Sequence, residues 1–243
     1  MKRALKNKLV SLSHEKDSRL ILALDFLRAM DQASPLMLLN LCRSLLRDLR
    51  NLVVGVKIGL PLLLSVGVEG VKYIIYDYGD SFYFIADFKL SDIPDVVDYA
   101  LGKLKEIGFD GAIVQLFPMG YGGVVEKHRN RELGIYGVAL MSHRNGKLFR
   151  ENFDLLVEYS LGLNLDGIIV GATDLESIKR ARERVGDKLL ILSPGVGVQG
   201  AEEAAAIRAG ADFEIVGRSI TLSLKPKDVA RRIVEAERRA LKG

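Results

Sequence analysis

The chain has 243 residues, the length of one large domain or two small ones. Hydrophobic residues make up 49% and charged residues 27%, which is close to the globular average and excludes a disordered or fibrous protein. The formal net charge is only +4, with both signs interspersed, so the composition excludes a strong polyelectrolyte binder. A single cysteine, Cys42, excludes an internal disulfide and favours a reducing, cytoplasmic setting.

The first residues are basic, and we assign residues 1–18 to a basic N-terminal arm. A signal peptide would continue from its charges into an apolar block, but Ser13-His14-Glu15-Lys16-Asp17 intervenes. No stretch reaches the ~20 apolar residues of a membrane span. We therefore expect a solvated or packing extension that contacts neither nucleic acid nor membrane. One domain is expected to follow it, over residues 19–243.

Eight apolar runs of strand length recur along the chain, nearly continuous rather than alternating, as is typical of parallel strands covered by helices. They are Leu20–Leu24, Leu52–Ile58, Phe82–Ala86, Gly111–Leu116, Ile135–Met141, Gly167–Val170, Leu189–Leu192 and Phe213–Val216. Helical spacing appears between them, for example over Pro35–Arg50, Asp95–Ile107, Leu175–Val185 and Lys227–Leu241. This alternation, in a chain near the usual ~250 residues, predicts a single-domain (β/α)₈ TIM barrel. A doubly wound open sheet, the alternative, usually has fewer strands.

Barrel sites lie where strands end, and charged residues close the first three strands. These residues are Asp25, Lys57, Asp87 and Lys89. The two-residue period of a strand puts Asp87 and Lys89 on one side and Phe88 on the other. An ion-pair network at the rim is the structural alternative. Four such residues at one end of the barrel favour a catalytic site.

Glycine-rich sequence follows the last two strands, at the usual phosphate position of this fold. Strand seven continues into Ser193–Gly200, and strand eight into Val216-Gly217-Arg218-Ser219. Glycines let backbone N–H groups approach an anion, and Arg218 adds a forked cationic donor. A flexible turn is the alternative for the glycines alone. Together with Arg218 they predict a phosphate site.

Two other polar residues follow strands but carry weaker signals. Ser142 either hydrogen-bonds the amide of a heterocyclic substrate or lies in a surface loop. Asp92 either belongs to the site or is the N-cap of the next helix. We expect His14 and His128 to be exposed. The scattered histidines and the single cysteine predict no metal site.

These motifs resemble the orotidine 5′-phosphate decarboxylase family. The core of the resemblance is Asp87-Phe88-Lys89-Leu90-Ser91-Asp92-Ile93-Pro94, an Asp-x-Lys-x-x-Asp signature. The match extends in chain order to Leu22-Ala23-Leu24-Asp25, Val56-Lys57-Ile58-Gly59, Met141-Ser142-His143, Ser193–Gly200 and Val216-Gly217-Arg218-Ser219. It covers about residues 19–240. The signature alone is shared with related sugar-phosphate enzymes, whereas the combination is specific.

The resemblance implies decarboxylation of orotidine 5′-monophosphate to UMP without a metal or organic cofactor. It implies that Lys89 protonates C6 and that Asp87 lies against the substrate carboxylate. Asp92 and Ile93 would reach into the partner's site in a homodimer. The remaining implied contacts are the ribose (Asp25, Lys57), the pyrimidine (Ser142), the lid (Pro194) and the phosphate (Gln199, Gly217, Arg218). Val96 stands where many relatives have a threonine that touches the ribose from the second subunit.

Two rival functions remain at this stage. A magnesium-dependent sugar-phosphate lyase or decarboxylase of the same superfamily usually has another acidic residue at the end of strand two, where this chain has Lys57-Ile58-Gly59. A non-catalytic phosphate-binding regulator would have no use for Asp87, Lys89 and Asp92. Both features favour the decarboxylase.

Overall fold

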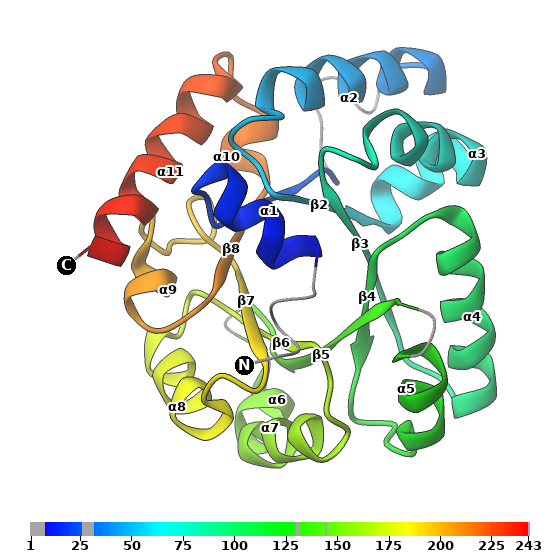
Figure 1. The fold of residues 1–243 in the computed structure, drawn as a ribbon, viewed down its shortest axis with the longest axis vertical. Coiled ribbons are helices and arrows are strands. Elements are labelled where there is room, and N and C mark those ends of the chain that lie inside the picture. Colours follow the sequence, from blue (N-terminus) through cyan, green and yellow to red (C-terminus); the bar gives the residue numbers. More distant parts are fainter. Residues whose placement is uncertain (1–7, 26–31, 130–131, 144, 243) are drawn as a thin grey trace.

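The computed structural model describes residues 8–25, 32–129, 132–143 and 145–242. Its eight parallel strands form a closed barrel in chain order, and β8 pairs with β1 (Figure 1). The strands are β1 (Leu20–Ala23), β2 (Gly55–Gly59), β3 (Tyr83–Leu90), β4 (Gly111–Gln115), β5 (Gly134–Leu140), β6 (Gly167–Val170), β7 (Leu190–Pro194) and β8 (Phe213–Val216). The predicted (β/α)₈ barrel is confirmed.

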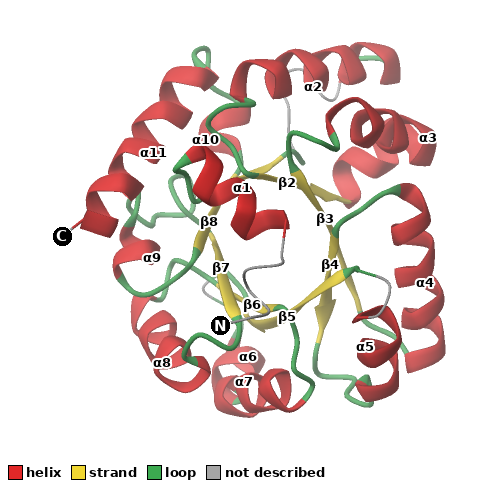
Figure 2. Ribbon diagram, in the orientation of Figure 1, coloured by secondary structure: helices red, strands yellow, loops and turns green. Residues whose placement is uncertain are grey.

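Helices surround the barrel as an outer ring (Figure 2). They are α2 (Pro35–Leu49), α3 (Leu60–Tyr78), α4 (Pro94–Ile107), α5 (Gly122–Arg129), α6 (Lys147–Glu151), α7 (Phe153–Gly162), α8 (Leu175–Val185), α9 (Ala205–Arg208), α10 (Arg218–Thr221) and α11 (Pro226–Lys242). The starts of α2, α3 and α4 carry Pro35, Pro61 and Pro94, where a missing backbone N–H costs little. Gly108 ends α4 in the left-handed conformation, with φ 109°.

The core has two layers because successive side chains of each strand point to opposite faces. The outer layer lies between strands and helices. The inner layer fills the barrel with side chains from β1 and β3–β8 and with Val54, which directly precedes β2. Its strand members include Ile21, Ile85, Ile113, Val138, Ile169, Leu192 and Ile215. No helix in the described ranges is long and apolar enough to cross a membrane.

Residues 8–16 of the N-terminal arm form helix α1 (Lys8–Lys16), which crosses one end of the barrel (Figure 1). Leu9 and Leu12 are buried in the inner layer of the core. Lys8 pairs with Asp110 at 2.8 Å, and Lys16 Nζ donates to the Val53 carbonyl at 2.9 Å. Burial lowers the pKa of Lys16 to about 8. This part of the arm therefore packs on the barrel, while residues 1–7 lie outside the described residues.

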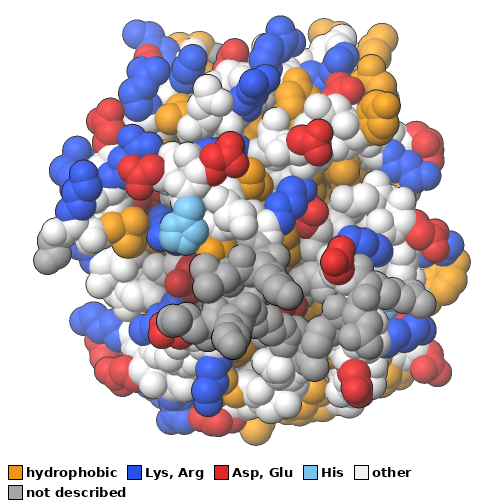
Figure 3. Space-filling model, viewed as in Figure 1, with side chains coloured by type: hydrophobic (Ala, Val, Ile, Leu, Met, Phe, Trp, Pro, Cys, Tyr) orange, Lys and Arg blue, Asp and Glu red, His pale blue; other side chains and the backbone are white. Residues whose placement is uncertain are grey.

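The face that carries α1 has lysine, arginine and acidic side chains interspersed (Figure 3), in line with the mixed charge of the sequence. His14 is exposed on this face, as expected. The expectation for His128 was wrong. Its side chain is buried between α4 and α5, where Nε2 lies 2.7 Å from Asp98 Oδ1. A carboxylate on the neighbouring helix gives the imidazole a partner that sequence spacing does not reveal.

Candidate active site

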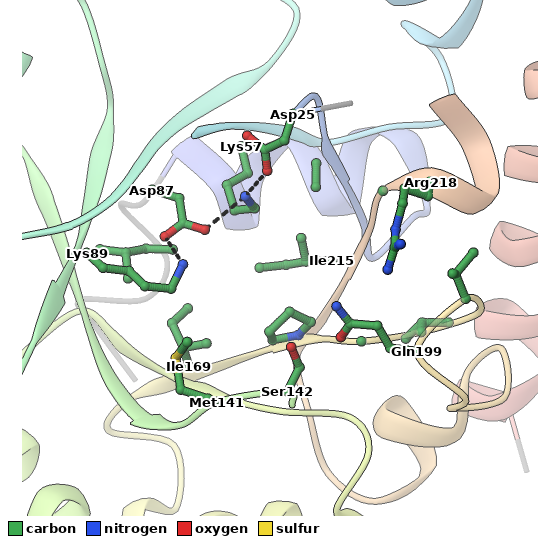
Figure 4. Close-up of a pocket in the computed structure, with 17 residues that line it drawn as sticks. Asp25, Lys57, Asp87, Lys89, Met141, Ser142, Ile169, Gln199, Ile215 and Arg218 are labelled. Atoms are coloured by element: carbon green, nitrogen blue, oxygen red, sulfur yellow. Dashed lines mark hydrogen bonds and ion pairs between the residues drawn. The ribbon is translucent and has the colours of Figure 1, made fainter. Parts of the chain in front are cut away.

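A cavity of about 260 Å³ opens at the end of the barrel where the strands end, opposite α1. Nine of the eleven predicted site residues line it (Figure 4). They come from or directly follow β1 (Asp25), β2 (Lys57), β3 (Asp87, Lys89), β5 (Ser142), β7 (Pro194, Gln199) and β8 (Gly217, Arg218). Their convergence follows from the topology, because all eight parallel strands end at the same rim.

Four charged side chains form a continuous chain of ion pairs along one side of this cavity (Figure 4). Lys57 Nζ lies 2.5 Å from Asp25 Oδ2 and 2.8 Å from Asp87 Oδ2. Lys89 Nζ lies 2.7 Å from the other oxygen of Asp87. The charges alternate in sign, so each carboxylate is next to at least one ammonium group.

The two lysines of this chain differ in exposure. The Lys57 side chain is 8% exposed and that of Lys89 is 35% exposed. Burial alone would lower the pKa of Lys57, but Asp87 and Asp25 outweigh that cost and raise it above its usual value. Burial would likewise raise the pKa of Asp87, yet Lys57 and Lys89 hold it below its usual value. Both lysines line the cavity, but Lys57 is the buried cation between two carboxylates and Lys89 is the more exposed ammonium group.

The backbone at the end of β3 departs from a regular strand. Ala86 pairs with Ala112 and Leu90 with Val114, so two extra residues are inserted on β3 between these pairs. Lys89 has φ 45°, a left-handed conformation unusual for a side chain of its size. Phe88 points away from the cavity and packs edge-on against Phe109. The predicted separation of Asp87 and Lys89 from Phe88 therefore holds, although an irregular backbone produces it.

Arg218 and Gln199 lie on the side of the cavity opposite Lys89 (Figure 4). Arg218 is exposed and forms no ion pair with any residue that the structure describes. In the loop after β7, Gly195, Gly197 and Gly200 have φ of 110°, 80° and 104°, which residues with side chains rarely adopt. The cavity therefore has an unpaired cation on one side and a compensated charge chain on the other.

Between these two sides the cavity is apolar. Ile113, Ile169 and Ile215 line it from β4, β6 and β8, together with Ala23, Met141, Val196 and Val198. Sequence analysis missed these residues because a continuously apolar strand does not reveal which of its faces is inward. Because the side chains of a strand alternate between its two faces, every second residue of β4, β6 and β8 points into the barrel. This two-residue period is the sequence signal that could have identified the three isoleucines.

Asp92 and Ile93 are the two predicted site residues that do not line the cavity of their own chain. Both are exposed, Ile93 to 62%. Ile93 is the N-cap residue of α4, and Asp92 Oδ1 accepts a hydrogen bond from the Ile93 N–H at 2.7 Å. Asp92 is therefore not the helix cap that sequence analysis weighed as its alternative.

The described ranges contain no group of three His, Cys, Asp or Glu side chains that could hold a metal ion. The two carboxylates of the cavity, Asp25 and Asp87, instead bind lysine ammonium groups.

Residues 18–233 match the model of the orotidine 5′-phosphate decarboxylase / HUMPS family. The chain belongs to this family. It is 33% identical to orotidine 5′-phosphate decarboxylase of Methanosarcina acetivorans, over 94% of this chain and 99% of that protein. It is 34% identical to the Thermococcus kodakarensis enzyme of the same name, over 90% of this chain and 97% of that protein. The resemblance predicted from the sequence is confirmed, and with it membership of a carboxy-lyase family.

Solved structures of the family share the same architecture. The orotidine 5′-monophosphate decarboxylase of Sulfolobus solfataricus superposes with a TM-score of 0.77 at 30% identity, over 92% of this chain and 99% of that one. The Methanocaldococcus jannaschii enzyme, complexed with the inhibitor BMP, superposes with a TM-score of 0.77 at 29% identity, over 90% of this chain and 98% of that one.

Proposed function

We propose that this protein decarboxylates orotidine 5′-monophosphate to UMP and carbon dioxide, a step of pyrimidine synthesis, without a metal or organic cofactor. The observation that carries the proposal is the chain of alternating charges from Asp25 to Lys89, facing an unpaired Arg218 across an apolar floor. One side suits a reacting carboxylate and the other suits a phosphate. The relatives named for this activity support the substrate.

The chemistry explains why such a charge chain is needed. Loss of carbon dioxide from C6 leaves a carbanion that the pyrimidine ring delocalises poorly, and no cofactor supplies an electron sink. Charge stabilisation must then come from preorganised groups of the protein. Lys89 is the more exposed of the two ammonium groups in the charge chain, so it is the group suited to stabilise the carbanion and protonate C6. Asp87, held beside it, would lie against the departing carboxylate.

The remaining contacts follow the resemblance. Asp25 and Lys57 would bind the ribose hydroxyls and Ser142 the pyrimidine. Gln199, Gly217 and Arg218 would bind the phosphate, and Pro194 would begin the lid. The phosphate contacts lie away from Lys89, so their binding energy can hold the substrate against the charge chain.

The magnesium-dependent rival is disfavoured by the position of Lys57. Its ammonium group binds both Asp25 and Asp87 and compensates the negative charge that a divalent cation would need. A regulator without catalytic activity would gain nothing from a buried charge chain, whose burial is costly.

We also propose a homodimer in which Asp92 and Ile93 complete the partner's site. Apolar side chains next to them support this assembly, because Ile93, Val96 and Tyr99 are 62%, 47% and 70% exposed. Contiguous exposed apolar side chains are typical of interaction surfaces. Val96 would meet the partner through its methyl groups, without the hydroxyl contact of many relatives. The cytoplasmic location stays a prediction.

Turnover of orotidine 5′-monophosphate in excess chelator tests the activity, followed by the fall in ultraviolet absorbance. Full turnover is expected. Turnover that requires added magnesium would contradict the metal-free part of the proposal. No turnover with or without magnesium would contradict the proposed activity and favour one of the two rivals.

Reassembly of two inactive variants tests the shared site. Equal amounts of Lys89→Ala and Asp92→Ala chains should pair at random, so half of the dimers are mixed. In each mixed dimer, one site combines the wild-type Lys89 of one chain with the wild-type Asp92 of the other. The second site carries both substitutions. About one site in four should regain activity by this symmetry argument. No recovery, with subunit exchange verified separately, would contradict the shared site.

A further inference from the structure

Gly59, the last residue of β2, contacts the charge chain directly through its backbone. Its N–H donates to Asp25 Oδ1 at 2.5 Å, while Asp25 Oδ2 binds Lys57 Nζ at 2.5 Å. Both carboxylate oxygens are therefore held by residues of one strand, two positions apart. Hydrogen bonds to a charged acceptor are the strong ones, and two from one rigid strand leave the carboxylate little freedom.

The backbone conformation does not require glycine at this position. Gly59 has φ −106° and ψ −177°, which is extended backbone that any residue adopts. The space around it does require glycine. A Cβ atom there would lie 2.4 Å from Asp25 Oδ1, 3.0 Å from Cγ and 3.3 Å from Oδ2, all atoms of one carboxyl group.

The Asp25 carboxylate is 14% exposed and is held by both Gly59 and Lys57. Displacing it from Gly59, for example toward the cavity that it lines, would break the hydrogen bond to the Gly59 N–H and change its position relative to the Lys57 ammonium group. Lys57 would then keep Asp87 as its remaining carboxylate partner among the described residues. A single methyl group at position 59 should thus disturb the charge chain from its Asp25 end.

We propose that Gly59 is a positioning residue: its N–H and its missing side chain together set the Asp25 carboxylate, and through it the Lys57 ammonium, for substrate binding and decarboxylation. Gly59 itself touches no substrate in this role. The proposal rests on the proposed function for its kinetic consequence, but its structural part concerns only Gly59 and Asp25.

A double-mutant cycle tests the role. In the wild-type background Gly59→Ala should lower kcat/KM for orotidine 5′-monophosphate about ten- to a hundredfold, because the added methyl group displaces the Asp25 carboxylate from its hydrogen bond to the backbone N–H. In an Asp25→Ala background the carboxyl group that the added methyl group would meet is absent. The same Gly59→Ala substitution should then change kcat/KM less than about twofold. Equal losses in the two backgrounds would overturn the proposal.

The free energy of unfolding, measured over the same four proteins, makes the test independent of the activity. Gly59→Ala should destabilise the wild type and leave the Asp25→Ala protein nearly unchanged. If Gly59→Ala alone fails to fold and the double variant folds, the proposal is supported. If the double variant also fails to fold while the Asp25→Ala protein folds, the proposal is overturned.

Gly55→Ala is the matched control on the same strand. A Cβ at Gly55 would approach Tyr83 O at 3.1 Å, Ile21 at 3.3 Å and Leu9 at 3.4 Å, all away from the cavity. Its effect on stability should be equal with and without Asp25. A wild-type protein that does not turn over the nucleotide would refute the proposed function, whereas the unfolding cycle would still decide the role of Gly59.

Discussion

Two groups of largely buried carboxyl side chains among the described residues, one at the cavity and one at the opposite end of the barrel, differ in their surroundings. At the cavity, Asp25 and Asp87 bind lysine ammonium groups at 2.5–2.8 Å. Near the opposite end of the barrel, Glu214 on β8 and Glu237 on α11 are fully buried. Glu214 accepts backbone N–H groups of Ala204 and Ala206, and no lysine or arginine forms an ion pair with either glutamate among the residues that the structure describes.

The pKa values respond in opposite directions. Burial raises the pKa of Glu214 to about 7 and that of Glu237 to about 8, and the backbone hydrogen bonds and nearby arginines do not offset it. At Asp87 the two lysines more than offset the same burial cost and lower the pKa. Backbone donors alone therefore leave a buried carboxyl group able to hold a proton near neutral pH, whereas adjacent ammonium groups keep it ionised.

Removing the exposed ammonium should have the largest effect. Lys89→Ala should lower kcat by about 10²–10⁴-fold, the usual contribution of a general acid, since it also removes a positive charge at the reacting atom. Folding should survive, because the side chain lies at the rim. Lys103→Ala, on the surface of α4, is the control. A variant that keeps a tenth of wild-type turnover would contradict the assignment of Lys89.

Replacing Lys57, the buried ammonium group, should leave the carboxyl groups of the cavity less compensated, as Glu214 and Glu237 are at the opposite end of the barrel. Lys57→Met leaves Asp25 and Asp87 buried beside one remaining lysine, and breaking a buried ion pair costs about 3–5 kcal/mol of stability. Chemical denaturation measures the loss. The pKa of Asp87 should rise, so the loss should shrink at low pH, where the carboxyl groups are protonated. A loss independent of pH would contradict this account of the charge chain.

Removing Arg218 tests the cation that no described carboxylate compensates. Arg218→Ala should weaken UMP binding by about 1.5–3 kcal/mol, the range for hydrogen bonds to charged groups. Uridine, which lacks the phosphate, should bind the variant and the wild type alike. Arg208→Ala, on α9, is the control. Equal losses for nucleotide and nucleoside would assign Arg218 a structural role instead.

The smallest expected effect concerns Glu237 and pH. Its pKa of about 8 in the folded chain exceeds its usual 4.5, so its contribution to stability is present at low pH and is lost as pH rises through 8. Glu237→Gln should match the wild type near pH 5 and exceed it by about 1–3 kcal/mol at pH 9. Thermal unfolding over this range checks it. Glu235→Gln, exposed on the same helix, should show no such pH dependence.

The predicted elements mostly lie within a few residues of the observed ones. Gly167–Val170, Phe213–Val216 and Leu175–Val185 agree at both ends. The largest difference is at β3, predicted to end at Ala86 and observed to reach Leu90. Local propensity could not foresee the inserted residues there, because the pairing with β4 resumes only at Leu90.

The sequence by itself determined the barrel, the family and the positions of the charged and glycine-rich strand ends. These features are local or periodic, and they can be read along the chain. Only the tertiary structure decided which carboxyl group meets which cation. It brought Asp25 onto Lys57 across 32 residues and left Glu237 with one oxygen unpartnered within the described residues. Electrostatics depends on distance and burial, and both are set only when the strands close into a barrel.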